Sequence, residues 1–166
     1  MSVDAGHAMA SRKHYSTMEE RFAARTSPSG GCIVWTGAKN QFGYGQIWTG
    51  ERLVQAHRYA WERTNGPIPD GMVIDHLCWN RACVNVAHLR VVTQAQNNQN
   101  ISGARSDSKS GVRGVRRHGN GWEARVQAGG VKYSSKHPTL EEAEAWVTAM
   151  RTKLMPFSQE QGRKLS

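Results

Sequence analysis

Two cysteines and a histidine recur at an even spacing in the middle of the chain. Cys78 and Cys83 are five residues apart, and His88 follows five residues later. Side chains spaced in this way on a tight loop can turn toward one point, and thiolate with imidazole is a ligand set that zinc prefers. The remaining cysteine, Cys32, would complete four ligands with no open position, which is the form of a structural zinc site. Alternatively, the three cysteines are small core residues, a common fate of free thiols.

The composition of the loop favours the zinc interpretation. Residues 75–89 hold too few apolar side chains to fold alone, so the metal would supply much of the stability, at about 10–16 kcal/mol in zinc-finger peptides. The cysteine count is odd, and the first 16 residues lack the apolar segment of a secretory signal. We therefore expect reduced thiols in a cytoplasmic protein that is not secreted.

A second group of residues offers different chemistry. Asp75 and His76 stand just before the loop, and Asn97 stands well after it. A neutral imidazole can take a proton from water near pH 7, and carboxylate and amide oxygens suit a hard divalent cation. Thiolates would be poor ligands for such a cation, which is a physical reason for two separate metal sites. His76 could instead belong to the zinc cluster, because residues two apart on a strand point to the same face.

Short elements must hold these two groups in place. We expect helices over residues 16–25 and 56–63, and a strand over residues 72–74 that leads directly to Asp75. A second strand after the loop should lead into a helix that carries Asn97. Glycine-rich turns separate three further strand candidates, which we expect to form one small antiparallel sheet. These candidates are residues 32–36, 44–48 and 52–55.

The pattern changes beyond residue 100. Residues 101–110 are rich in Ser, Gly and charge, which is typical of a linker. Gly119-Asn120-Gly121 is a strong hairpin signal, and Thr139 with Glu142 predicts the capped start of an amphipathic helix. We expect three strands and one helix that pack as a small second domain. The strand candidates are residues 113–118, 122–127 and 131–135.

The charge of the chain points to a polyanionic partner. The 166 residues carry 22 Lys and Arg against 13 Asp and Glu, a formal net charge of +9. Such a surplus favours nucleic acid first and an anionic membrane surface second. No apolar run approaches the roughly 18 residues of a membrane span. Basic residues on or beside the strands of the second domain are the candidate DNA contacts, namely Arg113, Arg116, Arg117, Arg125 and Lys132.

The central stretch resembles the HNH, or His-Me finger (ββα-metal), nucleases, and most closely their zinc-stapled homing-endonuclease branch. The resemblance covers roughly residues 30–100. It rests on Asp75-His76-Leu77-Cys78, Asn80-Arg81-Ala82-Cys83, Val84-Asn85, His88-Leu89, Val91-Val92-Thr93 and Asn97.

This resemblance implies a role for each member of the two groups. His76 would be the general base, and Asp75 and Asn97 would hold a catalytic Mg²⁺ or Mn²⁺. His88 would bind the structural zinc, at a place where many relatives have a structural Asn. An Arg preceding this motif acts on the scissile phosphate in zinc-stapled relatives, which implies that role for Arg58. The alternative for Arg58 is a solvated helix face. Asn80 and Asn85 are expected to shape the loop through backbone hydrogen bonds.

The second domain resembles the Apetala-type (ethylene-response-factor) DNA-binding domain. The likeness rests on Arg113-Gly114-Val115-Arg116, on Trp122-Glu123-Ala124-Arg125-Val126 and on the Glu-Glu-Ala of the helix. It implies a sheet that lies in the major groove, which is wide enough for a β-ribbon.

The sequence therefore predicts an α+β protein, in which a ββα-metal nuclease domain with structural zinc precedes a three-stranded sheet and one helix. The predicted function is a metal-dependent endonuclease of homing or phage type acting on double-stranded DNA. One site would nick, and a homodimer could cut both strands. The alternatives are a non-catalytic zinc-containing DNA-binding regulator and an RNA-binding zinc module. The expected boundaries are 1–29 (tail and short helix), 30–100 (nuclease), 101–110 (linker), 111–155 (DNA-binding domain) and 156–166 (tail).

Overall fold

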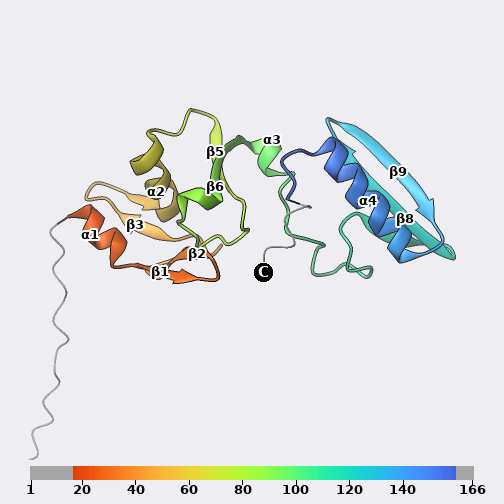
Figure 1. Cartoon of the computed structure of the whole chain (residues 1–166), viewed down its shortest axis with the longest axis horizontal. Coiled ribbons are helices and arrows are strands. Elements are labelled where there is room, and N and C mark those ends of the chain that lie inside the picture. Colours follow the sequence, from red (N-terminus) through yellow and green to blue (C-terminus); the bar gives the residue numbers. More distant parts are fainter. Residues whose placement is uncertain (1–16, 160–166) are drawn as a thin grey trace, which may run out of the picture.

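The computed structural model describes residues 17–159. Its elements gather in two parts that lie next to each other along the long axis, with the short helix α3 (Gln94–Asn97) between them (Figure 1). The first part contains helices α1 and α2 and three two-stranded hairpins, and the second contains a three-stranded sheet and helix α4. The predicted α+β class is confirmed. Within residues 17–159, no helix is both long enough and apolar enough to cross a bilayer.

Helix α1 (Met18–Ala23) is shorter than the predicted helix over residues 16–25. Thr17 caps it, because the Thr17 hydroxyl accepts a hydrogen bond from the backbone N–H of Glu20. Residue 16, where the helix was expected to start, lies outside the described residues. The helix ends at Ala23 because the chain then enters a strand that the sequence analysis did not predict.

The predicted three-stranded sheet is wrong, because its strands belong to two separate hairpins. Strand β1 (Thr26–Ser29) pairs with β2 (Cys32–Trp35), whereas β3 (Gln46–Trp48) pairs with β4 (Leu53–Gln55). The reason lies at Gly30 and Gly31, whose φ angles of 53° and 76° form a tight two-residue turn.

Trp35 is the centre of the first core. Its side chain is fully buried, and its ring centroid lies 5.4 Å from that of Phe22 on α1. Ile47 of β3 and Ala60 of helix α2 (Ala56–Asn65) complete this contact set together with Val84. The core thus packs both helices against the hairpins, which fixes the frame around the loop that carries the cysteines.

The hairpin of β5 (Met72–His76) and β6 (Leu89–Thr93) lies next to this frame. Its register pairs His76 with Leu89 and Asp75 with Arg90. The strand continues through Asp75 and His76, two residues beyond the predicted strand. Helix α3 follows directly, and Thr93 caps it. A strand, a loop, a second strand and a helix therefore appear in the predicted order.

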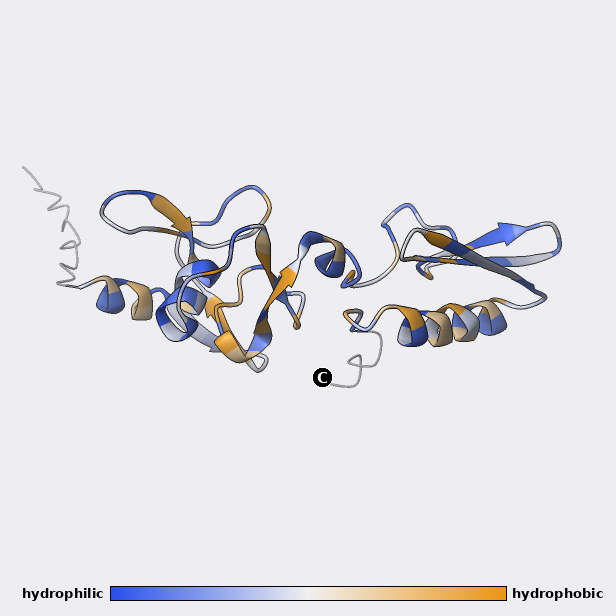
Figure 2. Cartoon of the chain, turned by 90° about the horizontal axis from the view of Figure 1, so that it is seen from above, coloured by the Kyte–Doolittle hydropathy of each residue, from blue (hydrophilic) through white to orange (hydrophobic). Residues whose placement is uncertain are grey.

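The second part is a sheet of β7 (Val115–His118), β8 (Gly121–Ala128) and β9 (Val131–His137), covered on one face by α4 (Leu140–Leu154). The apolar side of α4 faces the sheet (Figure 2). Thr139 caps α4 as predicted, by accepting from the Glu142 N–H.

The first strand of this sheet begins two residues later than predicted. Gly114 has a φ of +78°, and a Cβ built there would lie 2.5 Å from the Arg125 carbonyl oxygen. The backbone therefore turns at Gly114 before pairing starts at Val115.

Candidate active site and metal centre

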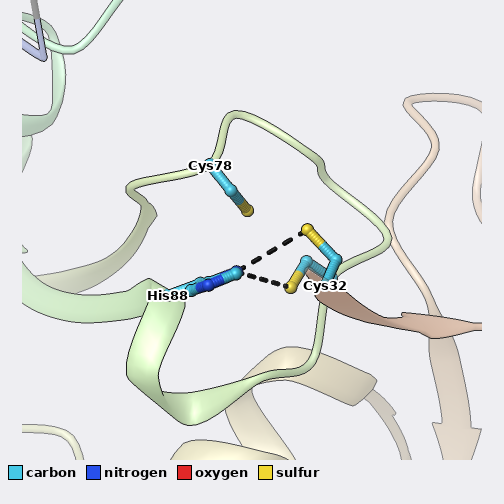
Figure 3. A group of neighbouring side chains, drawn as sticks. Cys32, Cys78 and His88 are labelled. Atoms are coloured by element: carbon cyan, nitrogen blue, oxygen red, sulfur yellow. Dashed lines mark hydrogen bonds between the residues drawn. The ribbon is translucent and has the colours of Figure 1, made fainter. Parts of the chain in front are cut away.

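Three thiols and one imidazole converge in the first part of the molecule. The ligand atoms of Cys32, Cys78, Cys83 and His88 all lie within 4.8 Å of one another. The Nδ1 atom of His88 is 3.6 Å from the Cys32 sulfur and 3.7 Å from the Cys83 sulfur (Figure 3). A tetrahedral zinc ion with ordinary bond lengths would separate such sulfur and nitrogen ligands by about 3.6 Å. The four side chains therefore fit a structural zinc site, and the predicted set is brought together in full.

Backbone pairing brings the distant Cys32 to this cluster. The N–H of Val84 donates to the Ile33 carbonyl, and the N–H of Trp35 donates to the Ala82 carbonyl, each at 2.7 Å. An isolated bridge also joins Val34 to Cys83. The loop thus lies along the free edge of β2, whose first residue is Cys32.

Two asparagines shape the loop as predicted. The side-chain oxygen of Asn80 accepts from the Ala82 N–H at 3.0 Å, and that of Asn85 accepts from the Ala87 N–H at 3.1 Å. Both are local turns that Asn stabilises well. They present Cys83 and His88 to the cluster.

Two of the thiols, Cys78 and Cys83, need a nearby cation to ionise in this environment. Burial raises the pKa of the Cys78 thiol to about 12 and also raises the pKa of Cys83. Without a metal, Cys78 and Cys83 therefore stay protonated at neutral pH, and zinc would displace their protons as it binds.

His76 lies at the end of β5 with a defined orientation. Its side chain is buried, and its Nε2 atom is 3.0 Å from the Cys83 carbonyl oxygen. A carbonyl oxygen only accepts, so Nε2 carries the proton and Nδ1 is the free base. Burial lowers the pKa of His76, which keeps the ring neutral at pH 7. The carbonyl of a cysteine in this cluster thus selects the tautomer of His76.

A cleft of about 310 Å³ opens in front of this histidine. Asp75, His76 and Asn97 all line it, as do Arg81 and Asn100. The structure therefore brings the predicted second group into one site, and His76 lies outside the four-residue zinc cluster.

The Asp75 carboxylate is held from two sides. Arg90 donates to Oδ2 through Nε at 2.9 Å, and its Nη2 lies 2.8 Å from the same oxygen. The Asn100 amide donates to Oδ1 at 2.8 Å and also to the His76 carbonyl at 3.0 Å. Oδ1 can accept more than one donor, so the carboxylate retains capacity for a cation in the cleft. Asp75 and Asn97 supply oxygen ligands of the kind that Mg²⁺ prefers.

The sequence analysis missed the partners of these residues. Asn100 is the last residue of the expected nuclease range, and no local pattern gives a role to Asn100 or to Arg90. His57 is also buried, and its ring centroid lies 4.8 Å from that of His76 and 5.4 Å from that of Tyr44. A single His beside an Arg gives no sign of burial, so only the fold reveals this cluster.

Two arginines near the site differ in position. Arg58 lies on the outer side of α2, with its guanidinium 4.0 Å from the Glu62 carboxylate, and it does not belong to the lining of the cleft. Arg81 does line the cleft, donates to the Phe42 carbonyl at 3.1 Å and lies over the Tyr44 ring at 5.6 Å. Arg81 is therefore better placed to meet a bound phosphate than Arg58.

The predicted DNA contacts of the second part fall into three groups. Arg116, Arg125 and Lys132 share the sheet face that points away from α4, because they alternate with the buried Val115, Ala124 and Val126. Arg117 projects to the other side, with its guanidinium 5.1 Å from the Trp122 ring centroid. Arg113 precedes the sheet and donates to the carbonyls of Gln99 and Ile101.

Glu123 organises the exposed face. Its carboxylate accepts from Arg116 at 2.7 Å and from Arg125 at 2.8 Å, and both hydrogen bonds lower the pKa of Glu123. Lys136 pairs with Glu123 in the register and adds a cation that the sequence analysis did not name. The face therefore has a net positive charge and ordered guanidinium groups.

Comparison with known proteins agrees with this geometry. A family profile described as HNH endonuclease matches residues 54–99. Protein 7.7 of Escherichia phage T7 is 43% identical over 70 residues, which cover 42% of this chain and 54% of that protein. The "Uncharacterized gene 5.3 protein" of Enterobacteria phage T3 is 48% identical over 69 residues, or 37% of this chain and 68% of the relative. Protein 3.8 of phage T7 is 31% identical over 100 residues, or 59% of this chain and 82% of the relative. No solved structure matches.

The match to Protein 7.7 spans about half of its length, whereas the matches to the other two relatives span two thirds or more. The chain therefore belongs to the family of these phage proteins, and it carries an HNH endonuclease family domain.

Proposed function

We propose that this protein is a metal-dependent endonuclease that hydrolyses phosphodiester bonds in double-stranded DNA. The observation that carries the proposal is the hydrogen bond between His76 Nε2 and the Cys83 carbonyl. It leaves Nδ1 of a neutral imidazole as a proton acceptor in a ring that lines the cleft.

The proposed reaction is an in-line displacement at phosphorus. Nδ1 of His76 takes a proton from water, and the water oxygen attacks as the bond to the leaving oxygen breaks. A divalent ion such as Mg²⁺ or Mn²⁺, held by Asp75 and Asn97, would stabilise charge on the phosphate and on the leaving oxygen. Arg81 at the cleft would orient the phosphate. Solvent protonates the departing oxygen.

Zinc has a separate role in this proposal. The Cys32, Cys78, Cys83 and His88 cluster holds the loop whose Cys83 carbonyl orients His76. Zinc would therefore support catalysis through structure, without touching the substrate.

The second part would supply DNA affinity. Arg116, Arg125 and Lys132 lie on the sheet face that α4 does not cover. The resemblance to Apetala-type domains implies that this face enters the major groove of DNA. A monomer has one site and would nick, and a homodimer could cut both strands. The phage relatives fit a homing or phage-type role in the host cytoplasm.

The test is a plasmid cleavage assay with Mg²⁺ that compares the wild type with His76→Ala and with His118→Ala. His118 is an exposed histidine on β7 that does not line the cleft; because it shares the sheet face of Arg116, the DNA affinity of this control is measured beside its cleavage. We expect nicked or linear DNA from the wild type and the control, and none from His76→Ala at unchanged zinc content. Equal cleavage by His76→Ala would refute the proposed base. Tight DNA binding without cleavage would favour the regulator, and preferential competition by RNA would favour the RNA-binding module.

A further inference from the structure

The chain returns to the HNH domain after helix α4. Met155 is buried in the second core, and the chain after it turns back toward the first part of the molecule (Figure 1). The N–H of Phe157 donates to the Gln99 side-chain oxygen at 3.2 Å. Residues 156–166 were expected to be a tail, but Phe157 contacts the segment that follows α3.

Phe157 contacts Arg90 in two ways. Its carbonyl oxygen accepts from Arg90 Nη2 at 2.5 Å, and its ring centroid lies 5.2 Å from the guanidinium carbon. The Nη2 atom has two hydrogens, so it can serve the Phe157 carbonyl and the Asp75 carboxylate together. Arg90 is thus held between the C-terminal segment and the cleft.

The contacts continue from Arg90 to the catalytic histidine. Arg90 binds Asp75, and Asn100 joins the Asp75 carboxylate to the His76 carbonyl. The Asn100 side-chain oxygen also accepts from the Trp79 indole at 2.6 Å, which fixes the orientation of the amide. Each of these hydrogen bonds joins groups that are buried or half-buried. Hydrogen bonds shielded from water hold side chains in one orientation more strictly than exposed ones do.

A second contact joins the two parts independently. Arg113 donates to the carbonyls of Gln99 and Ile101, and Arg151 of α4 donates to the Arg113 carbonyl. Arg151 is itself buried, at 4% exposure. Hydrogen bonds therefore hold both ends of the linker, at Gln99 and Ile101 before it and at Arg113 after it.

We propose that Phe157 is a positioning residue for the nuclease site, because it holds Arg90 against Asp75 and so fixes Asp75 beside His76. The proposal rests on the proposed nuclease function. The nuclease site would then depend on both parts of the molecule, because Phe157 follows helix α4 of the second part and contacts Arg90 of the first. Because Phe157 belongs to the same part as the basic sheet, its contact with Arg90 would also fix the position of sheet-bound DNA relative to the cleft.

The test compares Phe157→Ala with the wild type, with Phe157→Tyr and with a chain that ends at Gln159. Alanine removes the ring, tyrosine keeps it over Arg90, and the shortened chain keeps Phe157 while it loses the following residues. We expect kcat of Phe157→Ala to fall by on the order of ten- to hundred-fold, as for a small misplacement of catalytic groups. KM, DNA affinity and zinc content should stay unchanged, and the other two variants should cleave normally.

Nuclear magnetic resonance provides a readout that does not depend on cleavage. The Asn100 side-chain amide and the His76 ring signals should shift in Phe157→Ala and stay in place in Phe157→Tyr. Unchanged kcat in Phe157→Ala overturns the proposal, even if His76→Ala abolishes cleavage and so leaves the nuclease function standing. If the wild type itself does not cut, unchanged Asn100 and His76 signals overturn it. A chain ending at Met155 loses the Phe157 carbonyl as well as the ring, so its kcat should fall at least as far as that of Phe157→Ala.

Discussion

His57 determines how the stability of the HNH domain should depend on pH. The side chain is 3% exposed at the start of α2, and its Nδ1 has no hydrogen-bond partner among the described residues. Burial, then the nearby His76 and Arg58, lower its pKa from 6.5 to about 3. The native state thus keeps this imidazole neutral over a range in which the unfolded chain protonates it.

The sign of the effect follows from proton binding. Between about pH 3 and pH 6.5 the unfolded chain binds a proton at His57 that the native state does not bind, so the free energy of unfolding falls as the pH falls. Acidification from pH 7 to pH 5 should therefore remove about 2 kcal/mol through His57 alone. This loss depends mainly on the unfolded pKa, because pH 5 lies well above the native value of about 3.

Urea unfolding of wild type and His57→Gln at pH 7 and pH 5 measures this contribution. Glutamine is neutral at both pH values, so the wild type should lose about 2 kcal/mol more than the variant over this interval. Both samples contain saturating zinc, and any acid-induced weakening of the thiolate cluster is common to both and cancels in the comparison.

Equal losses in the two proteins would refute the reasoning. That result would mean that His57 is solvated in the native state or titrates normally there. A lower stability of the variant at pH 7 would not affect the test, because only the difference between the two pH values enters it.

Three further predictions address the metal centre, the sheet and the last helix. Cys32→Ser should abolish stoichiometric zinc binding at neutral pH, measured by atomic absorption, because it removes one of four converging ligands; retained zinc would show that the other three suffice. Arg116→Ala combined with Arg125→Ala should reduce the slope of log affinity against log salt by about 2, or about 1 for each phosphate that is no longer bound; an unchanged slope would place DNA elsewhere. Thr139→Ala should lower the free energy of unfolding, measured in urea, by about 1 kcal/mol, since it removes the hydrogen bond to the Glu142 N–H.

Local sequence features determined the elements of the site. The five-residue spacing of Cys78, Cys83 and His88 and the strand that leads to His76 are short-range patterns, and the structure contains both. Helix α4 and its cap were likewise predictable, because hydrophobic periodicity and capping depend on neighbours within a few residues. The pairing of β1 with β2 was missed because glycines fit both a hairpin turn and a simple break.

Only the tertiary structure decided which distant groups complete the site. The edge pairing of β2 brings Cys32 to the zinc cluster, and the packing of α2 buries His57 against His76. Arg90 and Phe157, which are 67 positions apart, meet because the chain returns after α4. Such contacts arise from the packing of whole elements, and no local pattern of residue types records which surfaces will face each other.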